Sequence, residues 1–435
     1  MIDKKLYDSR LVTMDEAIDE ALFPHANVVL GGGVATPDAF TEAIYRKRET
    51  IPFFNLFTVI YFGNCEHLRP EMRGKIRPVV NFMEAQARKA YAEGLLDFIP
   101  CHFHEVPSLF REGYFPVDIA VVHVSLPDEN GLCSFGLACD YTKPAADNAK
   151  VIIAELNPHM PRVGGAENTI HIKDIDYIVE VNRPIRTVPQ AEVGEIEKRI
   201  GQYCASLVKD GATLQLGIGA IPDAVLFNLE DRKDLGIHTE MFSDGVMNLV
   251  QKGVVTGNCK NIEKSKVVTA FITGTKDLYD FVNDNPDILL KPVDFTNDPY
   301  IIGQIDNFVS INSAIEIDLY GQVTAESIGY RLFSGSGGQV DFLRGVKRSK
   351  GGISIIALPS TAAKGRVSRI VPCLQEGSIV TSGRNEVDYI VTEYGIAKLK
   401  GKTMSERAKA LIDIAHPDFR EDLIKAAKNM IGYFA

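Results

Sequence analysis

The sequence predicts an α/β protein of two similar domains, and its length, the alternation of its elements and an internal repeat all support this. The chain has 435 residues, enough for two or three domains of about 100–200 residues each. Short β-branched runs alternate with helix-like segments, which is typical of a buried sheet flanked by helices. Two segments of the first half recur, in the same order, in the second half. Such a repeat predicts two domains of one architecture.

The alternation assigns each element in order along the chain. Apolar, β-branched runs predict strands at 28–30, 57–61, 119–124, 151–155, 213–216, 267–272, 309–311, 353–358 and 389–392. Segments with the period of an amphipathic helix predict helices at 14–22, 37–47, 196–207, 222–229 and 404–414.

The repeat consists of two pairs of segments. ANVVLGGGVATPDAF, from Ala26, and ATLQLGIGAIPDAV, from Ala212, each predict a strand, a glycine loop and a helix that Pro-Asp opens. SFGLACDYTKPAADNAKVIIAELN and GSGGQVDFLRGVKRSKGGISIIALP each run from a small-residue loop through an Asp to a buried strand. Between the halves, residues 182–195 hold two prolines and no periodicity. We therefore expect domains at 1–185 and 186–435.

Composition narrows the class of protein. Hydrophobic residues make up 45% and charged residues 24% of the chain, an ordinary globular composition. The net charge of −10 gives no global attraction for nucleic acid or anionic lipid, so an anion site must be local. No apolar stretch reaches the ~20 residues of a membrane-spanning helix, and the N-terminus lacks the pattern of a secretory signal. Seven scattered cysteines without a Cys-x-x-Cys pair favour reduced thiols and a cytoplasmic protein.

The two glycine loops are candidate anion sites. Each follows a predicted strand and precedes a predicted helix, so its backbone N–H groups would suit a phosphate or a developing oxyanion. Both lack the third glycine of G-x-G-x-x-G, and no Walker pattern occurs in the chain, so a nicotinamide-dependent dehydrogenase is weakly supported. A tight strand-to-helix turn without a ligand is the alternative.

Glu240 lies in GIHTEMFSDGVMNL, 23 residues after Gly217. That spacing fits one helix and a return strand and would bring Glu240 to the edge of the sheet where α/β proteins bind ligands. A carboxylate there can act as a nucleophile, a base or a metal ligand, whereas a solvated glutamate is the alternative.

Two further segments have a functional and a structural interpretation. The loop from Ser334 holds three glycines in four positions and precedes the basic run Arg344, Lys347, Arg348 and Lys350; it could admit a phosphorylated ligand or form a solvated hairpin tip. On a strand, His102 and His104 would share one face. No remote His or Cys cluster completes a metal site, so a packed structural or substrate-lining segment is favoured and no metal is expected.

Together, LGIGAIPDAV, HTEMFSDG, FTNDPY, NSAIEIDLYGQV, SGSGGQVDF, FHEVPSLF and the ending VTEYGIAKLKGKTMSERAKALIDIAHPDF resemble the acetyl-CoA hydrolase/transferase family over essentially the full length. The resemblance implies two open α/β CoA-transferase domains with the active site in the cleft between them. It also implies acetyl-CoA or CoA as a substrate, no permanently bound cofactor, and a homodimer or a dimer of dimers.

The resemblance also implies roles for individual residues. Glu240 matches the nucleophilic glutamate of the family, and Gly338 matches a residue that donates to the oxyanion and contacts CoA. Asn297 matches an active-site asparagine, although Asp298 stands where the family often has histidine. CoA-binding positions are implied at Gly217, Ile218, Gly219, Ala220, Ile221 and Ile315.

The implied reaction moves CoA from acetyl-CoA to a short-chain acid through a glutamyl-CoA thioester, with ping-pong kinetics. 4-Hydroxybutyrate is the first-choice acceptor. Transfer between butyryl-CoA and acetate, hydrolysis of acetyl-CoA and a non-catalytic CoA-binding protein are the alternatives. Hydrogen bonds to the charged form of Glu240 would have to offset its desolvation, and we expect Ser243 or Asn297 to supply one.

Overall fold

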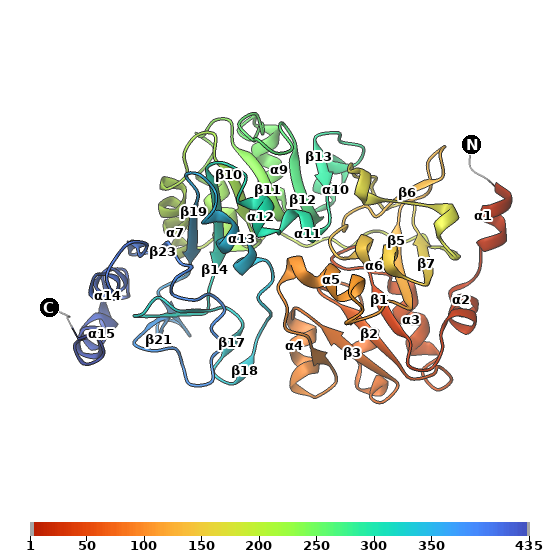
Figure 1. Ribbon diagram of the computed structural model, residues 1–435, viewed down its shortest axis with the longest axis horizontal. Coiled ribbons are helices and arrows are strands. Elements are labelled where there is room, and N and C mark those ends of the chain that lie inside the picture. Colours follow the sequence, from red (N-terminus) through yellow and green to blue (C-terminus); the bar gives the residue numbers. More distant parts are fainter. Residues whose placement is uncertain (1–3, 433–435) are drawn as a thin grey trace. The chain divides into compact units, whose positions relative to one another are not determined.

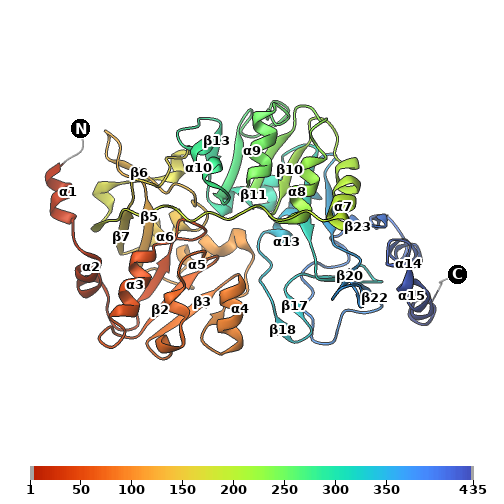
Figure 2. The ribbon, with the colours of Figure 1, turned by 180° about the vertical axis from the view of Figure 1, so that it is seen from behind.

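The computed structural model describes residues 4–432. By its internal contacts the chain forms two compact units: unit 1 is Met1–Pro189 with Val268–Thr296, and unit 2 is Gln190–Val267 with Asn297–Ala435. The sequence suggested a single boundary at 185/186, whereas this grouping assigns residues 268–296 to the first unit. Figures 1 and 2 show both units with the chain coloured along the sequence.

Unit 1 contains a parallel sheet with strand order β4-β3-β2-β1-β5-β7-β9. Its strands are β1 (Asn27–Leu30), β2 (Phe54–Thr58), β3 (Ile76–Val80), β4 (Asp97–Phe98), β5 (Ile119–Val124), β7 (Val151–Leu156) and β9 (Tyr177–Glu180). Its helices are α1 (Lys4–Arg10), α2 (Met14–Ala21), α3 (Asp38–Arg46), α4 (Ala85–Ala92), α5 (Val106–Arg111) and α6 (Thr142–Asn148). Every residue of β5 is buried, as expected for a parallel strand covered on both faces.

Shorter elements complete unit 1. Strands β6 (Leu132–Ser134) and β8 (Thr169–His171) form an antiparallel pair. Residues 268–296 carry β12 (Val267–Ile272), α10 (Lys276–Val282), β13 (Ile288–Leu290) and α11 (Val293–Thr296). The segment with His102 and His104, weighed above as a strand, instead forms a short 3₁₀ helix, Phe103–Glu105.

In unit 2 the strands β11-β10-β14-β19-β23-β24 lie side by side in this order. They are β10 (Thr213–Leu216), β11 (Gly236–Phe242), β14 (Phe308–Ser313), β19 (Ile353–Ala357), β23 (Tyr389–Thr392) and β24 (Gly395–Lys398). The helices are α7 (Glu195–Ser206), α8 (Ala220–Phe227), α9 (Asp244–Gln251), α12 (Pro299–Ile302), α13 (Gln339–Val346), α14 (Met404–Asp413) and α15 (Pro417–Met430). Figure 2 shows α7, α8 and α9 over one face of this sheet, and Figure 1 shows α12 and α13 on the other.

Small strands complete unit 2. They are β15 (Glu316–Asp318), β16 (Val323–Thr324), β17 (Ser327–Ile328), β18 (Arg331–Leu332), β20 (Thr361–Ala362), β21 (Val367–Ser368) and β22 (Ile370–Val371). Helices α14 and α15 contribute Ala408, Leu411 and Leu423 to a buried apolar cluster with residues of β19 and β23. No helix among residues 4–432 is long and apolar enough to cross a membrane.

Capping side chains explain where two of the helices begin. At α2, the backbone N–H of Glu16 donates to the Thr13 hydroxyl, and the Glu16 carboxylate accepts from the Thr13 backbone N–H. Thr403 and Glu406 repeat this arrangement at α14. Each capping box satisfies two backbone donors that the first turn leaves unbonded, so the sequence marks both starts.

The predicted elements are largely confirmed. All five helices occur within two residues of the predicted ends, and so do eight of the nine strands. The strand predicted at 57–61 is β2, which starts three residues earlier, at Phe54. Asn55 interrupts its apolar run and pairs with Asn27 on β1 through their side-chain amides, 2.9 Å apart. One strand that matters for the site, β11, was not among those predicted.

The internal repeat is confirmed in strand order. β2-β1-β5-β7-β9 in unit 1 corresponds to β11-β10-β14-β19-β23 in unit 2. A glycine loop and a helix follow both β1 and β10, and α6 and α13 precede β7 and β19. The chain therefore consists of two α/β units of the same basic topology.

Candidate active site

Three of the predicted site residues meet in unit 2. Glu240 lies near the carboxyl end of β11, Asn297 precedes α12, and Gly338 is the N-cap of α13. The Asn297 Nδ2 donates a hydrogen bond of 2.7 Å to the Glu240 Oε2. A Cβ on residue 338 would overlap both of these atoms. The carboxylate therefore packs against the α-carbon of Gly338, and only glycine leaves it this space.

The Glu240 carboxylate accepts a hydrogen bond from a buried amide. Asn297 is fully buried, whereas Glu240 is partly exposed. A fixed amide donor stabilises the charged form of a carboxylate and so offsets part of its desolvation. Of the two donors expected from the sequence, Asn297 supplies such a bond; Ser243 is the N-cap of α9 and makes no side-chain capping bond there.

The second glycine loop lies beside Glu240. β10 and β11 pair in parallel with Thr213 opposite Gly236, and the same register extended to the ends of the strands sets Gly217 opposite Glu240. The Thr239 hydroxyl donates to the Leu216 carbonyl at 3.0 Å, which holds the two strand ends together. The predicted binding loop and the predicted nucleophile are thus neighbours.

This loop has room for another molecule. A Cβ on Gly217 or on Gly219 would meet no atom within 4 Å, and Ile218 is 45% exposed. Gly219 has φ +114°, a conformation that favours glycine. Ala220 and Ile221 then begin α8, so this loop lies at a helix N-terminus, where the first backbone N–H groups have no intrahelical partner.

Ile315, the remaining predicted CoA-binding position, lies two residues beyond β14. Its backbone N–H donates to the Thr324 carbonyl at 2.8 Å. The amide is therefore engaged in the small sheet, and a ligand contact through the backbone here would have to use the carbonyl group.

The first glycine loop is closed by a side chain. Residues 31–38 are buried, and Tyr141 packs so closely on Gly32 that a Cβ there would lie 2.7 Å from the Tyr141 Oη. That hydroxyl donates to the Leu30 carbonyl at 2.9 Å and accepts from the Val59 N–H at 3.2 Å. This loop is a filled strand-to-helix turn, so the structural interpretation holds for it.

The repeat explains why the two loops differ. Val29 lies opposite Phe57 and Gly33 opposite Tyr61 in the β1–β2 register, which sets Gly31 opposite Val59. Val59 therefore occupies in unit 1 the place of Glu240 in unit 2. Tyr141 is the N-cap of α6, as Gly338 is of α13. Unit 1 thus has an apolar residue and a tyrosine ring where unit 2 has a carboxylate and a glycine.

The glycine loop from Ser334 is not a hairpin tip. It leads into α13, and the segment from Gly337 to Phe342 is buried. In the basic run, Arg344 pairs with Glu386 at 2.9 Å and the Lys347 ammonium donates to the Asn385 carbonyl. A phosphate approaching these side chains would compete with existing partners.

Sequence reasoning missed the support beneath Gly338. The Phe342 ring would lie 3.2 Å from a Cβ on residue 338, and it stacks on Phe308 with 6.1 Å between ring centroids. Both aromatic side chains are fully buried. The apolar spacing of Val340, Leu343 and Val346 could have identified a helix here.

His102 and His104 are both partly exposed. The rings of His102 and His104 stack with centroids 6.1 Å apart. Within residues 4–432, no three His, Cys, Asp or Glu side chains are grouped so that they could hold a metal ion. All seven cysteines lie within residues 4–432, and none of them forms a disulfide there.

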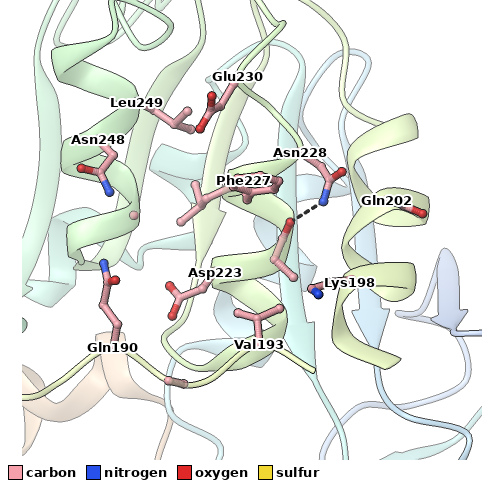
Figure 3. Close-up of a pocket in the computed structure, with 14 residues that line it drawn as sticks. Gln190, Val193, Lys198, Gln202, Asp223, Phe227, Asn228, Glu230, Asn248 and Leu249 are labelled. Atoms are coloured by element: carbon pink, nitrogen blue, oxygen red, sulfur yellow. Dashed lines mark hydrogen bonds between the residues drawn. The ribbon is translucent and has the colours of Figure 1, made fainter. Parts of the chain in front are cut away.

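A separate cavity of about 360 Å³ lies among α7, α8, α9 and the segment at 190–193 (Figure 3). Its charged lining residues are Lys198, Asp223 and Glu230. One cation against two carboxylates does not suit a polyphosphate. None of the predicted site residues is among those that line this cavity.

Comparison with known proteins establishes the family. Residues 1–189 match the N-terminal domain, and residues 274–427 the C-terminal domain, of acetyl-CoA hydrolase/transferase. The chain belongs to the acetyl-CoA hydrolase/transferase family. Among members of this family, the 4-hydroxybutyrate coenzyme A transferase of Clostridium kluyveri is 50% identical over 98% of this chain and 99% of its own. The butyryl-CoA:acetate CoA-transferase of Anaerostipes caccae is 39% identical over 98% of this chain and 97% of its own.

A solved family structure extends the comparison. The crystal structure of 4-hydroxybutyrate CoA-transferase from Porphyromonas gingivalis is 51% identical, covers 98% of this chain and 99% of its own, and superposes with a TM-score of 0.86. The resemblance noted in the sequence is thereby confirmed, and the chain is a CoA-transferase.

Proposed function

We propose that this CoA-transferase moves CoA from acetyl-CoA to a short-chain carboxylic acid, with 4-hydroxybutyrate as the first-choice acceptor, through a thioester on Glu240. The observation that carries the proposal is the hydrogen bond of 2.7 Å from Asn297 to the Glu240 carboxylate, which packs on the bare α-carbon of Gly338. A carboxylate that is held by a fixed donor and partly exposed beside an open backbone loop has the features of a nucleophile.

The proposed reaction passes through an acyl-glutamyl anhydride and a glutamyl-CoA thioester. A carboxylate oxygen of Glu240 attacks the thioester carbonyl, and the tetrahedral intermediate expels CoA thiolate to leave an acyl-glutamyl anhydride. The thiolate then attacks the glutamyl carbonyl, which releases acetate and leaves a glutamyl-CoA thioester. The acceptor carboxylate runs these steps in reverse and departs as its CoA ester, so Glu240 is regenerated.

Each group near Glu240 has a proposed part in these steps. Each tetrahedral intermediate carries an oxyanion, and the backbone N–H of Gly338 is the proposed donor to it. Asn297 orients the carboxylate and favours its charged form. Backbone groups of Gly217–Ile221 are the proposed CoA contacts, and Ile315 and Gly338 are further ones.

The chemistry requires no energy source beyond the thioester. One thioester replaces another, so the exchange is close to thermoneutral without ATP, and CoA enters as a substrate rather than as a resident cofactor. Water must be kept from the anhydride and the glutamyl thioester, because hydrolysis competes at both stages. A hydrolase that admits water is therefore the natural second outcome.

The choice of acceptor rests on similarity. The 50% identity to a 4-hydroxybutyrate coenzyme A transferase over 98% of the chain favours 4-hydroxybutyrate, and the 39% identity to a butyryl-CoA:acetate CoA-transferase makes butyrate the alternative. A site that bonds the hydroxyl group would prefer 4-hydroxybutyrate strongly, whereas an apolar pocket would discriminate by only about 10–200-fold. A cytoplasmic homodimer, or a dimer of dimers, is the proposed form of the enzyme.

The decisive experiment is intact-protein mass spectrometry after incubation with acetyl-CoA and no acceptor. Wild type should gain a CoA-sized adduct without the acetyl group, and Glu240→Ala should gain none. Glu240→Gln, which keeps the side-chain size, serves as the matched control and should also stay unmodified. Intact acetyl-CoA and no adduct would favour a CoA-binding protein, whereas rapid release of free CoA without an adduct would indicate a hydrolase.

A further inference from the structure

Helices α12 and α13 approach each other unusually closely in unit 2. A Cβ on Gly345 of α13 would lie 2.5 Å from the Ile302 Cβ and 2.6 Å from its Cγ2. A Cβ on Gly303, at the end of α12, would lie 2.7 Å from the Arg348 Cβ. Gly345 thus admits a residue of α12, and the C-cap glycine of α12 admits Arg348, two residues beyond the end of α13. Two close contacts therefore fix the separation of the helices.

Both helices begin at the proposed active site. Asn297 lies two residues before α12, and the chain between them is held by Asp298, whose carboxylate accepts from the Tyr300 N–H at 2.7 Å. Pro299 is the first residue of the helix and fixes its φ. Gly338 is the N-cap of α13. A shift of one helix against the other is thus transmitted within two residues to the groups around Glu240.

The two helices share one apolar cluster. Ile302, Ile305, Phe308, Phe342 and Val346 are all fully buried in it. Phe342 also lies beneath Gly338. The cluster therefore joins the support of Asn297 to the support of Gly338, and the Gly345–Ile302 contact sets its width.

We propose that Gly345 and Ile302 are positioning residues for the CoA-transfer reaction: their contact sets the place of the Asn297 amide relative to Gly338 and so the alignment of the Glu240 carboxylate. The inference rests on the proposed function, since it concerns the same carboxylate. Neither residue touches the substrate in this scheme, and both act through the helix that carries them.

The size of the effect follows from the distances. An alanine Cβ at position 345 needs about 3.4 Å for ordinary contact, and it has 2.5 Å. The opposing atom is the Cβ of Ile302, which no side-chain rotation can move, so the helix backbones must separate by about 1 Å. A misplacement of that size at a catalytic group lowers the rate by roughly 100-fold.

The first test compares Gly345→Ala with Val346→Ala, a variant of the neighbouring residue in the same cluster. Gly345→Ala should lower kcat by roughly 100-fold and slow the formation of the glutamyl-CoA adduct equally, with the KM for acetyl-CoA within about threefold of wild type. KM should change little because most of the proposed CoA contacts lie in Gly217–Ile221, a loop that leads into α8, and α8 packs on α7 and α9. Val346→Ala removes buried volume without forcing the helices apart, so it should lower the melting temperature and leave kcat near wild type.

A double variant distinguishes an effect of helix position on kcat from an effect of protein stability. The three atoms nearest to the new Cβ all belong to the Ile302 side chain, so Gly345→Ala combined with Ile302→Gly clears the overlap. This double variant should regain most of its kcat while its melting temperature falls further. Gly345→Ala combined with Ile302→Ala should not recover, because the obstructing Cβ remains. If the double variant with Ile302→Gly does not fold, Gly303→Ala provides the test instead. Its Cβ would overlap the Arg348 Cβ, so it should reproduce the loss of kcat.

The outcomes distinguish the two proposals. Absence of an adduct on wild type would overturn the proposed function itself. An adduct on wild type together with a Gly345→Ala variant of unchanged kcat would overturn only the positioning inference. So would equal losses of kcat in Gly345→Ala and Val346→Ala, because these would follow stability rather than helix separation.

Discussion

Replacing Gly338 with alanine tests the geometry around Glu240 most directly. The backbone of Gly338 has φ −87° and ψ 0°, which alanine adopts without strain. The variant also keeps its backbone N–H, the proposed oxyanion donor. As an N-cap, alanine is less favourable than glycine by about 1 kcal/mol, so we expect a folded protein with a slightly lowered melting temperature.

The effect on the site should be much larger. The added Cβ would overlap both the Glu240 Oε2 and the Asn297 Nδ2 and would lie 3.2 Å from the Phe342 ring. Phe342 is fully buried and prevents the new Cβ from shifting toward its ring. The carboxylate or the amide must therefore move by more than about 1 Å. Their hydrogen bond of 2.7 Å would not survive that movement. We expect kcat to fall at least about 100-fold.

Steady-state kinetics with acetyl-CoA and 4-hydroxybutyrate, together with the rate at which the CoA adduct appears in the mass spectrum, would measure this loss. Circular dichroism would verify the fold. A folded Gly338→Ala protein with kcat within about threefold of wild type would refute the reasoning, because Glu240 could then not be held against this glycine during the reaction.

Four other changes should have distinct results. Gly217→Ala adds a Cβ into open space, so kinetics should give an increased KM for acetyl-CoA with an unchanged melting temperature. Asn297→Ala removes a charge-assisted hydrogen bond of about 1.5–3 kcal/mol, and kcat should fall about 10–100-fold. Tyr141→Phe removes the buried hydrogen-bond partner of the Leu30 carbonyl and the Val59 N–H. Urea unfolding should therefore show a free energy of unfolding lower by about 1–3 kcal/mol, with kcat unchanged. Burial raises the pKa of Glu155 from 4.5 to about 8. The folded protein thus keeps a proton that the unfolded chain loses, and the free energy of unfolding should fall as pH rises from 4.5 to 8. Glu155→Gln should remove this pH dependence, which lowers the free energy of unfolding by on the order of 4 kcal/mol between pH 4.5 and 8.

The skeleton of the fold could be predicted because its central strands are buried on both faces. β5 is buried along its whole length and β7 at all but its first residue. Most residues of both strands are apolar, so they appear in the sequence as short apolar runs. The glycine loops after β1 and β10 then mark the strand-to-helix turns. These local signals depend on no distant residue, and for that reason both the elements and the repeat were visible.

β11 was not among the strands assigned from apolar runs, and only the spacing after Gly217 implied a strand there. Its middle residues His238, Thr239 and Glu240 are polar, although the first two are fully buried. A strand that presents functional groups breaks the apolar pattern by which strands are found, which is the expected place for such a conflict. The spacing from Gly217 located Glu240 at the right edge of the sheet nonetheless, since one helix and one strand fit into 23 residues.

The close packing of α12 and α13 was beyond sequence reasoning for a different reason. Gly345 lowers the helix propensity of its own segment, and its purpose becomes visible only with Ile302 opposite it. The two positions are 43 residues apart in the chain. A glycine in a helix signals a close approach but not the partner, and only the three-dimensional arrangement supplies that.

The comparison of the two units shows why only unit 2 has room for the proposed nucleophile. A carboxylate at the end of the second strand needs the space beside the helix N-cap, and in unit 2 Gly338 leaves that space. In unit 1 the ring of Tyr141 occupies the N-cap position and hydrogen-bonds to Leu30 and Val59 instead. Placing a glutamate at position 59 alone would set a charge against a buried ring, and shortening Tyr141 alone would open a cavity with nothing to react. The two positions are therefore coupled. A tyrosine at the helix N-cap requires an apolar residue at the end of the second strand, whereas a glycine at the N-cap leaves room for a glutamate.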